Sequence, residues 1–162
     1  MKPGGKFHKL SMSDAPLRGK TVLVRADYNV PLTKDGQIAD DYRIRMSLPT
    51  IKKLLDQNCR VVIISHLGRP DGKRDEAYSL TPVAKRLATL LERPVRFVDD
   101  CIGSKVYMAI KRTPQGSVTL LENLRFYPGE EANDMEFARQ LAKQTHAQDF
   151  VQDGFGVVHR AH

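Results

Sequence analysis

Ile64-Ser65-His66-Leu67-Gly68-Arg69-Pro70 is the stretch of the sequence that decides the expected fold. It closes a run of β-branched apolar residues, 61–64, which predicts a strand that is covered on both faces. Gly68 supplies backbone freedom and Pro70 fixes φ, so the chain has to leave the strand direction here. His66 and Arg69 are therefore presented just past the end of a buried strand.

Strand-like and helix-like segments alternate on either side of this stretch. Between short apolar runs, apolar residues recur at the spacing of one helix face. This alternation implies right-handed βαβ crossovers, so we expect an α/β fold, a Rossmann-like, three-layer α/β/α domain with a parallel sheet. The expected strands are 21–25, 60–65, 95–98, 118–121 and 150–151, with a small hairpin excursion at 33–38.

Capping signals and prolines predict where the helices begin. Pro49 is tolerable only in the first turn of a helix, so the first helix is expected to start near Ser47, with Arg43 at its entrance. The later helices are expected to have N-caps at Thr81 (before Pro82), at Asp99 or Asp100, and at Asn133, which forms a capping-box pattern with Glu136.

Length and composition favour one domain that binds an anion. The 162 residues are 41% hydrophobic and 28% charged, with a net charge of +7. We expect a flexible leader over residues 1–13 and one domain over 14–162. Cys59 and Cys101 have no metal-like spacing and are expected to be reduced thiols. Neither a secretory signal nor an apolar run of membrane-spanning length is present, so we expect a cytoplasmic protein.

Polar side chains follow four of the five expected strands. Because ligands of such sheets bind beyond the carboxyl ends of the strands, these side chains should converge in space. Arginines and imidazoles together with a few polar acceptors suit a small, multiply charged anion that also carries hydroxyls. The members are Asp27 and Asn29, His66 and Arg69, Asn123 and Arg125, His159 and Arg160, joined by Arg43 at the helix entrance.

Each member taken alone has a simpler interpretation. A single arginine after a strand can be a solvated charge, and Asp27 with Asn29 can form an Asx-type turn. His159 and His162 lie three residues apart, but a metal site would need further ligands that the sequence does not place, and no metal site is expected. The sequence has neither a Gly-x-Gly-x-x-Gly fingerprint nor a Gly-x4-Gly-Lys-Ser/Thr loop, so no nucleotide site is visible.

At these same segments the sequence closely resembles the N-terminal domain of phosphoglycerate kinase. The matching segments occur in the order and spacing of that family from about Leu17 onward. They are Val24-Arg25-Ala26-Asp27-Tyr28-Asn29-Val30-Pro31-Leu32, Arg43-Ile44, Ser65-His66-Leu67-Gly68-Arg69-Pro70, Leu121-Glu122-Asn123-Leu124-Arg125-Phe126, and Asp153-Gly154-Phe155-Gly156 with His159-Arg160-Ala161-His162.

The resemblance implies a two-domain kinase of glycolysis that transfers a phosphoryl group between ATP and 3-phosphoglycerate, giving 1,3-bisphosphoglycerate and ADP. By matching position, Asp27 and Asn29 would contact the glycerate end of the substrate, and Arg43 would stabilise the phosphoryl group in transfer as the catalytic residue. The phosphate cradle would be His66, Arg69, Arg125 and Arg160, with Leu67 and Gly68 in the substrate-binding loop.

The family binds Mg-ATP or ADP in a separate C-terminal domain, whose glycine-rich phosphate loops do not occur within these residues. No cofactor is therefore expected in this portion, which should bind substrate as a monomer but show no turnover alone. The last motif departs from the family pattern at Gly154, Val157 and Val158. The alternative function is a stand-alone module of the same fold that binds an anion or RNA, although the resemblance itself implies neither nucleic-acid nor membrane binding.

Overall fold

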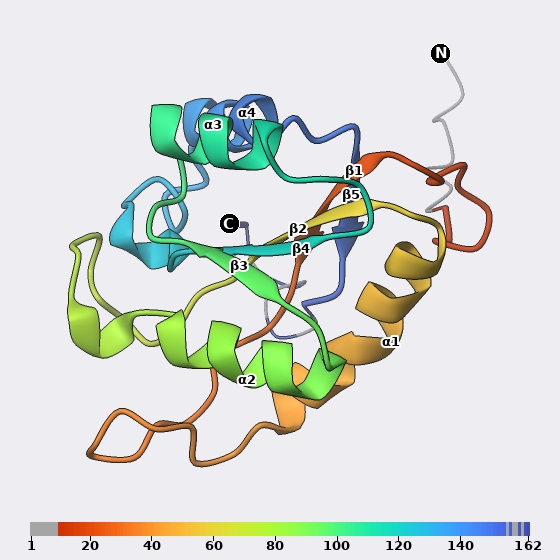
Figure 1. The fold of residues 1–162 in the computed structure, drawn as a ribbon. Helices are drawn as coiled ribbons and strands as arrows, with labels where there is room; N and C mark the ends of the chain where they lie inside the picture. Colours follow the sequence, from red (N-terminus) through yellow and green to blue (C-terminus); the bar gives the residue numbers. More distant parts are fainter. Residues whose placement is uncertain (1–9, 155, 157–158, 160) are drawn as a thin grey trace.

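The structure is a computed structural model that describes residues 10–154, 156, 159 and 161–162. Its centre is a five-stranded sheet with the order β3-β4-β2-β1-β5, in which every pair of neighbours is parallel. The sheet crosses the middle of the molecule in Figure 1. Its strands are β1 (Thr21–Arg25), β2 (Arg60–Ile64), β3 (Val95–Val98), β4 (Val118–Leu121) and β5 (Asp149–Gln152).

Helices cover both faces of this sheet. The helices α1 (Tyr42–Asp56) and α2 (Thr81–Leu91) pack on one face, and α3 (Ser104–Lys111) and α4 (Met135–Gln144) pack on the other (Figure 1). Two short 3-10 helices, η1 (Glu76–Tyr78) and η2 (Leu124–Phe126), lie in the loops. The predicted α/β fold, with three layers and a parallel sheet, is confirmed.

The period-two alternation of the strands divides the core into two apolar clusters. In β1, Val22 and Val24 belong to the cluster beneath α1 and α2, whereas Leu23 belongs to the cluster beneath α3 and α4. In β2, Val61 and Val62 divide in the same way. Because these central strands are buried on both faces, their sequences are apolar without alternation.

The first helix begins earlier than predicted. It starts at Tyr42 rather than near Ser47, so Pro49 lies inside it. A proline at this position removes one backbone hydrogen bond, that to the carbonyl of Arg45. Arg45 and Pro49 are both exposed, so the freed carbonyl lies on the face of the helix that water can reach. Burial of Ile44 and Ile51 on the opposite face supplies the apolar packing that stabilises the helix.

The predicted N-caps are also displaced by one to a few residues. Thr81 is the first residue of α2, and its backbone N–H donates to Ser79 Oγ at 3.2 Å. The cap of α3 is Gly103 rather than Asp99 or Asp100. The cap of α4 is Asp134, whose carboxylate accepts from the N–H of Glu136, whereas Asn133 has a φ of 53°. Two capping residues in a row directly precede α4, whereas the cap positions of α2 and α3, Leu80 and Gly103, make no side-chain capping hydrogen bond.

The remaining predictions concern the N-terminal segment, the excursion and the cysteines. Leu32 and Ile38 form an antiparallel bridge, which confirms the excursion at 33–38. Residues 1–9 lie outside the described part, while Met12 packs against the core, and the boundary after residue 13 stays a prediction. Cys59 and Cys101 are buried and free. None of the helices in the described part of the chain combines the length and the hydropathy that a membrane-spanning segment requires.

Candidate functional site

A polar pocket of about 270 Å³ lies beyond the carboxyl ends of β1, β2 and β4. These strands are adjacent in the sheet, so the residues that follow them meet at one edge. Among the residues that the structure describes, the pocket holds three guanidinium groups and one carboxylate, which makes this part of the chain electropositive. It is lined by Asp27, Asn29, Arg43, His66, Gly68, Arg69, Arg125 and Gly156.

Three described residues selected from the sequence, Leu67, Asn123 and His159, are not among those that line the pocket. Leu67 is buried, with 3% of its surface exposed, and its backbone N–H donates to Asn123 Oδ1 at 3.2 Å. Leu67 therefore supports the loop after β2 from the interior of the protein. Arg160 lies outside the described residues, and Phe155, Val157 and Val158 of the last motif do so as well. His159 is exposed.

Asp27 and Arg43 form an ion pair at the pocket. Arg43 Nη1 donates to both carboxylate oxygens of Asp27, at 2.8 and 2.7 Å. The backbone N–H of Asn29 also donates to Asp27 Oδ1, at 3.3 Å, which is the Asx-type turn considered above. Asp27 therefore both shapes the turn after β1 and orients an arginine. A Cβ on Gly156 would collide with this carboxylate.

Gly68 connects the turn after β1 with the segment after β4. Its backbone N–H donates to Asn29 Oδ1 at 2.9 Å, and its carbonyl accepts from Arg125 Nη1 at 3.0 Å. The residue has a φ of 63°, and a Cβ there would run into the ring of Tyr78. Glycine is thus required twice, by the left-handed backbone and by the close approach of the ring.

Asn123 holds the segment after β4 in place. Its Oδ1 accepts from the backbone N–H groups of Leu67 and Arg125, at 3.2 and 3.0 Å. Its Nδ2 donates to the carbonyls of Leu67 and Tyr78, at 2.7 and 3.0 Å. The side chain is fully buried and uses all its polar atoms on the backbone. Asn123 is therefore structural, whereas its neighbour Arg125 reaches the pocket.

A buried charge cluster next to the pocket was not predicted from the sequence. Glu130 accepts from Arg25 Nη2 at 2.9 Å through one oxygen and from Arg125 Nε at 3.1 Å through the other. Burial alone would raise the pKa of Glu130, but its hydrogen bonds and charge interactions with the two arginines hold that pKa below its ordinary value. Arg25 could have been noticed as a charged residue ending an apolar strand. Glu130 follows Pro128-Gly129 in a loop and gives no comparable signal.

His66 is uncharged in this setting at neutral pH. The residue is 5% exposed, and burial, reinforced by the charges of Arg125 and Arg25, lowers its pKa to about 4. Arg25 Nη2 lies 3.2 Å from His66 Nδ1. The positive charge of the pocket therefore comes from arginines, and His66 contributes a neutral hydrogen-bonding group.

Comparison with known proteins finds one family throughout. A family model described as phosphoglycerate kinase matches residues 12–162. The phosphoglycerate kinase of Chlorobaculum tepidum is 51% identical over 156 residues, which are 96% of this chain and 39% of that protein. The enzyme of Dictyoglomus turgidum is 54% identical over 94% of this chain and 38% of its own length.

Solved structures agree with this finding. The phosphoglycerate kinase of Coxiella burnetii superposes with a TM-score of 0.81 at 41% identity, covering 94% of this chain and 37% of that one. The chain thus spans under two-fifths of the length of the relatives that it matches. The sequence similarity and the structural similarity both identify one family, and the chain belongs to the phosphoglycerate kinase family.

Proposed function

We propose that this chain is the substrate-binding, N-terminal part of a phosphoglycerate kinase and that its pocket binds 3-phosphoglycerate. The observation that carries the proposal is the pocket itself, where side chains from positions 27 to 125 meet at one sheet edge. Three arginines and a neutral histidine face one carboxylate there. A three-carbon acid that carries a phosphate, a carboxylate and a hydroxyl matches this set of donors and acceptors.

The phosphate would lie against His66, Arg69 and Arg125. Arg69 is exposed at the pocket wall, and the side chain of Arg125 is almost fully buried beside it. Among the described residues, Arg125 Nη2 has no hydrogen-bond partner although it is buried. A buried donor without an acceptor is costly, so an anionic oxygen would stabilise this corner of the pocket. By family position, Arg160 would be a further member of the cradle.

The glycerate end would lie against Asp27 and Asn29, whose oxygens can accept from a hydroxyl group. Arg43 would then face the carboxylate that receives the phosphoryl group and stabilise the charge that spreads over it during transfer. A carboxylate is already a competent nucleophile, so the reaction needs no strong general base. Asp27 acts through Arg43, because its carboxylate fixes the direction of the guanidinium.

Mg-ATP or ADP would be supplied by the second domain of the full-length kinase. None of the residues at this pocket forms a glycine-rich phosphate loop, so we assign the nucleotide to that domain. The residues described here would bind and orient the acceptor and expose its carboxylate for in-line transfer. We further propose that the protein acts in the cytoplasm and that the chain is monomeric.

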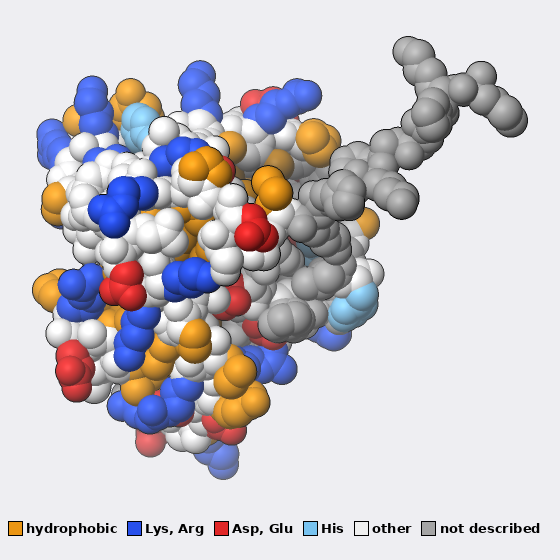
Figure 2. Space-filling model, turned by 90° about the vertical axis from the view of Figure 1, so that its right-hand side faces the viewer, with side chains coloured by type: hydrophobic (Ala, Val, Ile, Leu, Met, Phe, Trp, Pro, Cys, Tyr) orange, Lys and Arg blue, Asp and Glu red, His pale blue; other side chains and the backbone are white. Residues whose placement is uncertain are grey.

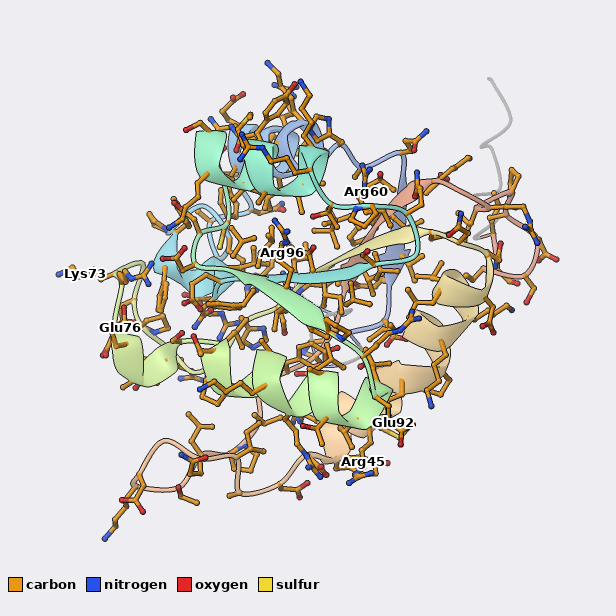
Figure 3. The ribbon with its side chains drawn as sticks, viewed as in Figure 1. Arg45, Arg60, Lys73, Glu76, Glu92 and Arg96 are labelled. Carbon is orange, nitrogen blue, oxygen red and sulfur yellow. The ribbon has the colours of Figure 1, made fainter. Side chains whose placement is uncertain are left out.

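Titration with 3-phosphoglycerate tests this function. In ¹H–¹⁵N spectra of the chain, saturable shifts are expected at His66 and at the side-chain N–H groups of Arg69. Arg69→Gln should weaken binding about tenfold, as expected for the loss of a charge-assisted hydrogen bond. Lys73→Gln removes the same charge from the outer part of the loop (Figure 3) and should change affinity less than twofold. Equal effects of the two variants, or no saturable shift, would reject the proposed site.

The alternative function, an RNA-binding module, is not favoured. On the face shown in Figure 2, the described lysines and arginines are interspersed with acidic and hydrophobic side chains. Nucleic-acid binding proteins instead gather basic residues in a patch or stripe. RNA binding with a steep salt dependence would support this alternative.

A further inference from the structure

Glu130 lies behind the pocket rather than in it, yet it contacts both arginines of the buried cluster. Its side chain is 3% exposed, and its two oxygens accept from Arg25 at 2.9 Å and from Arg125 at 3.1 Å. His162 Nδ1 lies 3.4 Å from Oε1 of the same carboxylate. Burying a carboxylate between two arginines costs desolvation free energy, which can offset the attraction between the charges. A gain in stability therefore does not by itself explain why Glu130 lies there.

The first consequence concerns Arg125. Glu130 takes Nε, and the carbonyl of Gly68 takes Nη1 at 3.0 Å, so the plane of the guanidinium is fixed from two sides. Of the three nitrogens of the guanidinium, these two contacts leave Nη2 without a partner among the described residues. The arginine is thus oriented before any ligand arrives, which lowers the entropy that binding has to offset.

The second consequence concerns His66. Arg25 Nη2 lies 3.2 Å from His66 Nδ1, and a guanidinium can only donate. Nδ1 must therefore accept, which places the proton of the neutral ring on Nε2. His66 lines the pocket, and the ring nitrogen that Arg25 leaves free is then an N–H donor rather than a lone pair. Arg25 keeps this orientation because Glu130 holds the same Nη2 group.

We propose that Glu130 is a positioning residue: through Arg125 and Arg25 it fixes a guanidinium and the Nε2–H tautomer of His66 as donors for the bound phosphate. The proposal deepens the proposed function and rests on it for the identity of the ligand. It differs from a simple charge effect in the sign that it predicts. Removing a negative charge beside an anion site should tighten anion binding. Losing the contacts of Glu130 with Arg25 and Arg125, which we call the clamp, should instead weaken it.

Glu130→Gln and Glu131→Gln form the matched pair for the test. Glu131 Oε1 lies 3.7 Å from Arg125 Nε, but this side chain is 45% exposed and forms no ion pair with Arg25. Both substitutions remove one negative charge next to Arg125. With 3-phosphoglycerate as the probe, Glu130→Gln should weaken binding about tenfold and Glu131→Gln should leave it unchanged or slightly tighter. Tighter or unchanged binding by folded Glu130→Gln would overturn the proposal.

The tautomer of His66 is measured without any ligand. The ¹⁵N shifts of the wild-type ring at pH 7 should show an unprotonated Nδ1 and a protonated Nε2, and Glu130→Gln should move both towards a mixture. A wild-type ring protonated on Nδ1 would overturn the proposal even if Glu130→Gln did not fold. Absence of 3-phosphoglycerate binding with the Nε2–H tautomer intact would instead reject the proposed function and leave the clamp standing.

Discussion

Arg43 Nη1 donates to both carboxylate oxygens of Asp27, at 2.8 and 2.7 Å, and both residues line the same pocket. Asp27 follows β1, and Arg43 is the second residue of α1, so the pair joins a strand end to a helix start. The side chain of Arg43 remains 47% exposed. An exposed pair of this kind contributes little to stability, so we propose that its position at the pocket serves ligand binding.

Asp27→Asn should strengthen the binding of inorganic phosphate severalfold. The substitution removes the only carboxylate among the described residues that line the pocket and releases Arg43 from its ion pair. The free energy of unfolding should change by less than about 1 kcal/mol, because the pair is partly exposed. Calorimetric titration and urea unfolding measure the two quantities. Asp35→Asn is the control, because it removes the same charge from the exposed excursion at 33–38, and it should leave phosphate affinity unchanged. Weaker phosphate binding by Asp27→Asn would contradict the prediction.

Arg43→Ala, made in a full-length kinase that carries this chain, should lower kcat about 10²-fold, as expected for the loss of a group that stabilises transition-state charge. The dissociation constant of 3-phosphoglycerate, measured directly, should change much less, because the group acts mainly during transfer. Arg45→Ala is the control: Arg45 lies two residues further along α1, projects from its outer surface and pairs with Asp41 (Figure 3). Equal losses of kcat and affinity in Arg43→Ala would show that Arg43 is mainly a binding group.

The stability of the protein should fall as the pH drops from about 6.5 to 4, in part because of His66. Its pKa is about 4 in the folded state and near 6.5 in the unfolded chain, so protons favour the unfolded state across this interval. Above pH 6.5 the free energy of unfolding is higher by about 3 kcal/mol, from His66 alone, than it is well below pH 4. Urea unfolding of wild type and His66→Gln over this range isolates the effect, since the carboxylates titrate in both. Parallel pH profiles of the two proteins would be the contrary result.

Gly68→Ala should destabilise the fold by more than backbone strain alone accounts for. The residue has a φ of 63°, and a Cβ there would meet the ring of Tyr78. Gly36 has a φ of 74° with no atom within 4 Å of its Cβ position, so Gly36→Ala measures the strain separately. We expect about 1 kcal/mol for Gly36→Ala and about 3 kcal/mol for Gly68→Ala in urea unfolding. Similar costs for both would mean that the Tyr78 ring moves aside freely.

Much of the fold could be predicted because short, mainly apolar runs separated by turn residues mark the strands. The bounds of β1, β3 and β4 agree with the predicted 21–25, 95–98 and 118–121. The start of α1 was wrong because the rule for proline considers the backbone alone. In the structure, Pro49 lies on the exposed side of a helix that is stabilised by packing on the other side.

Most residues that line the pocket could be predicted from the sequence, but the buried ion pairs that hold them in place could not. Residues that follow adjacent parallel strands must meet at one edge, so Asp27, His66 and Arg125 could be grouped before any coordinates. Glu130 and Arg25 are 105 positions apart, and their ion pair depends on how the loop after η2 folds back. No local pattern in the sequence encodes such a contact. The roles of the grouped residues in binding remain predictions.

Crystals of the chain grown with 3-phosphoglycerate provide the most direct test. The phosphate should lie between His66, Arg69 and Arg125, with Nε2 of His66 and Nη2 of Arg125 within hydrogen-bond distance of its oxygens. The carboxylate of the ligand should point towards Arg43. Ligand density at another surface of the molecule, with these side chains unchanged and their pocket filled only by water, would contradict the proposed site.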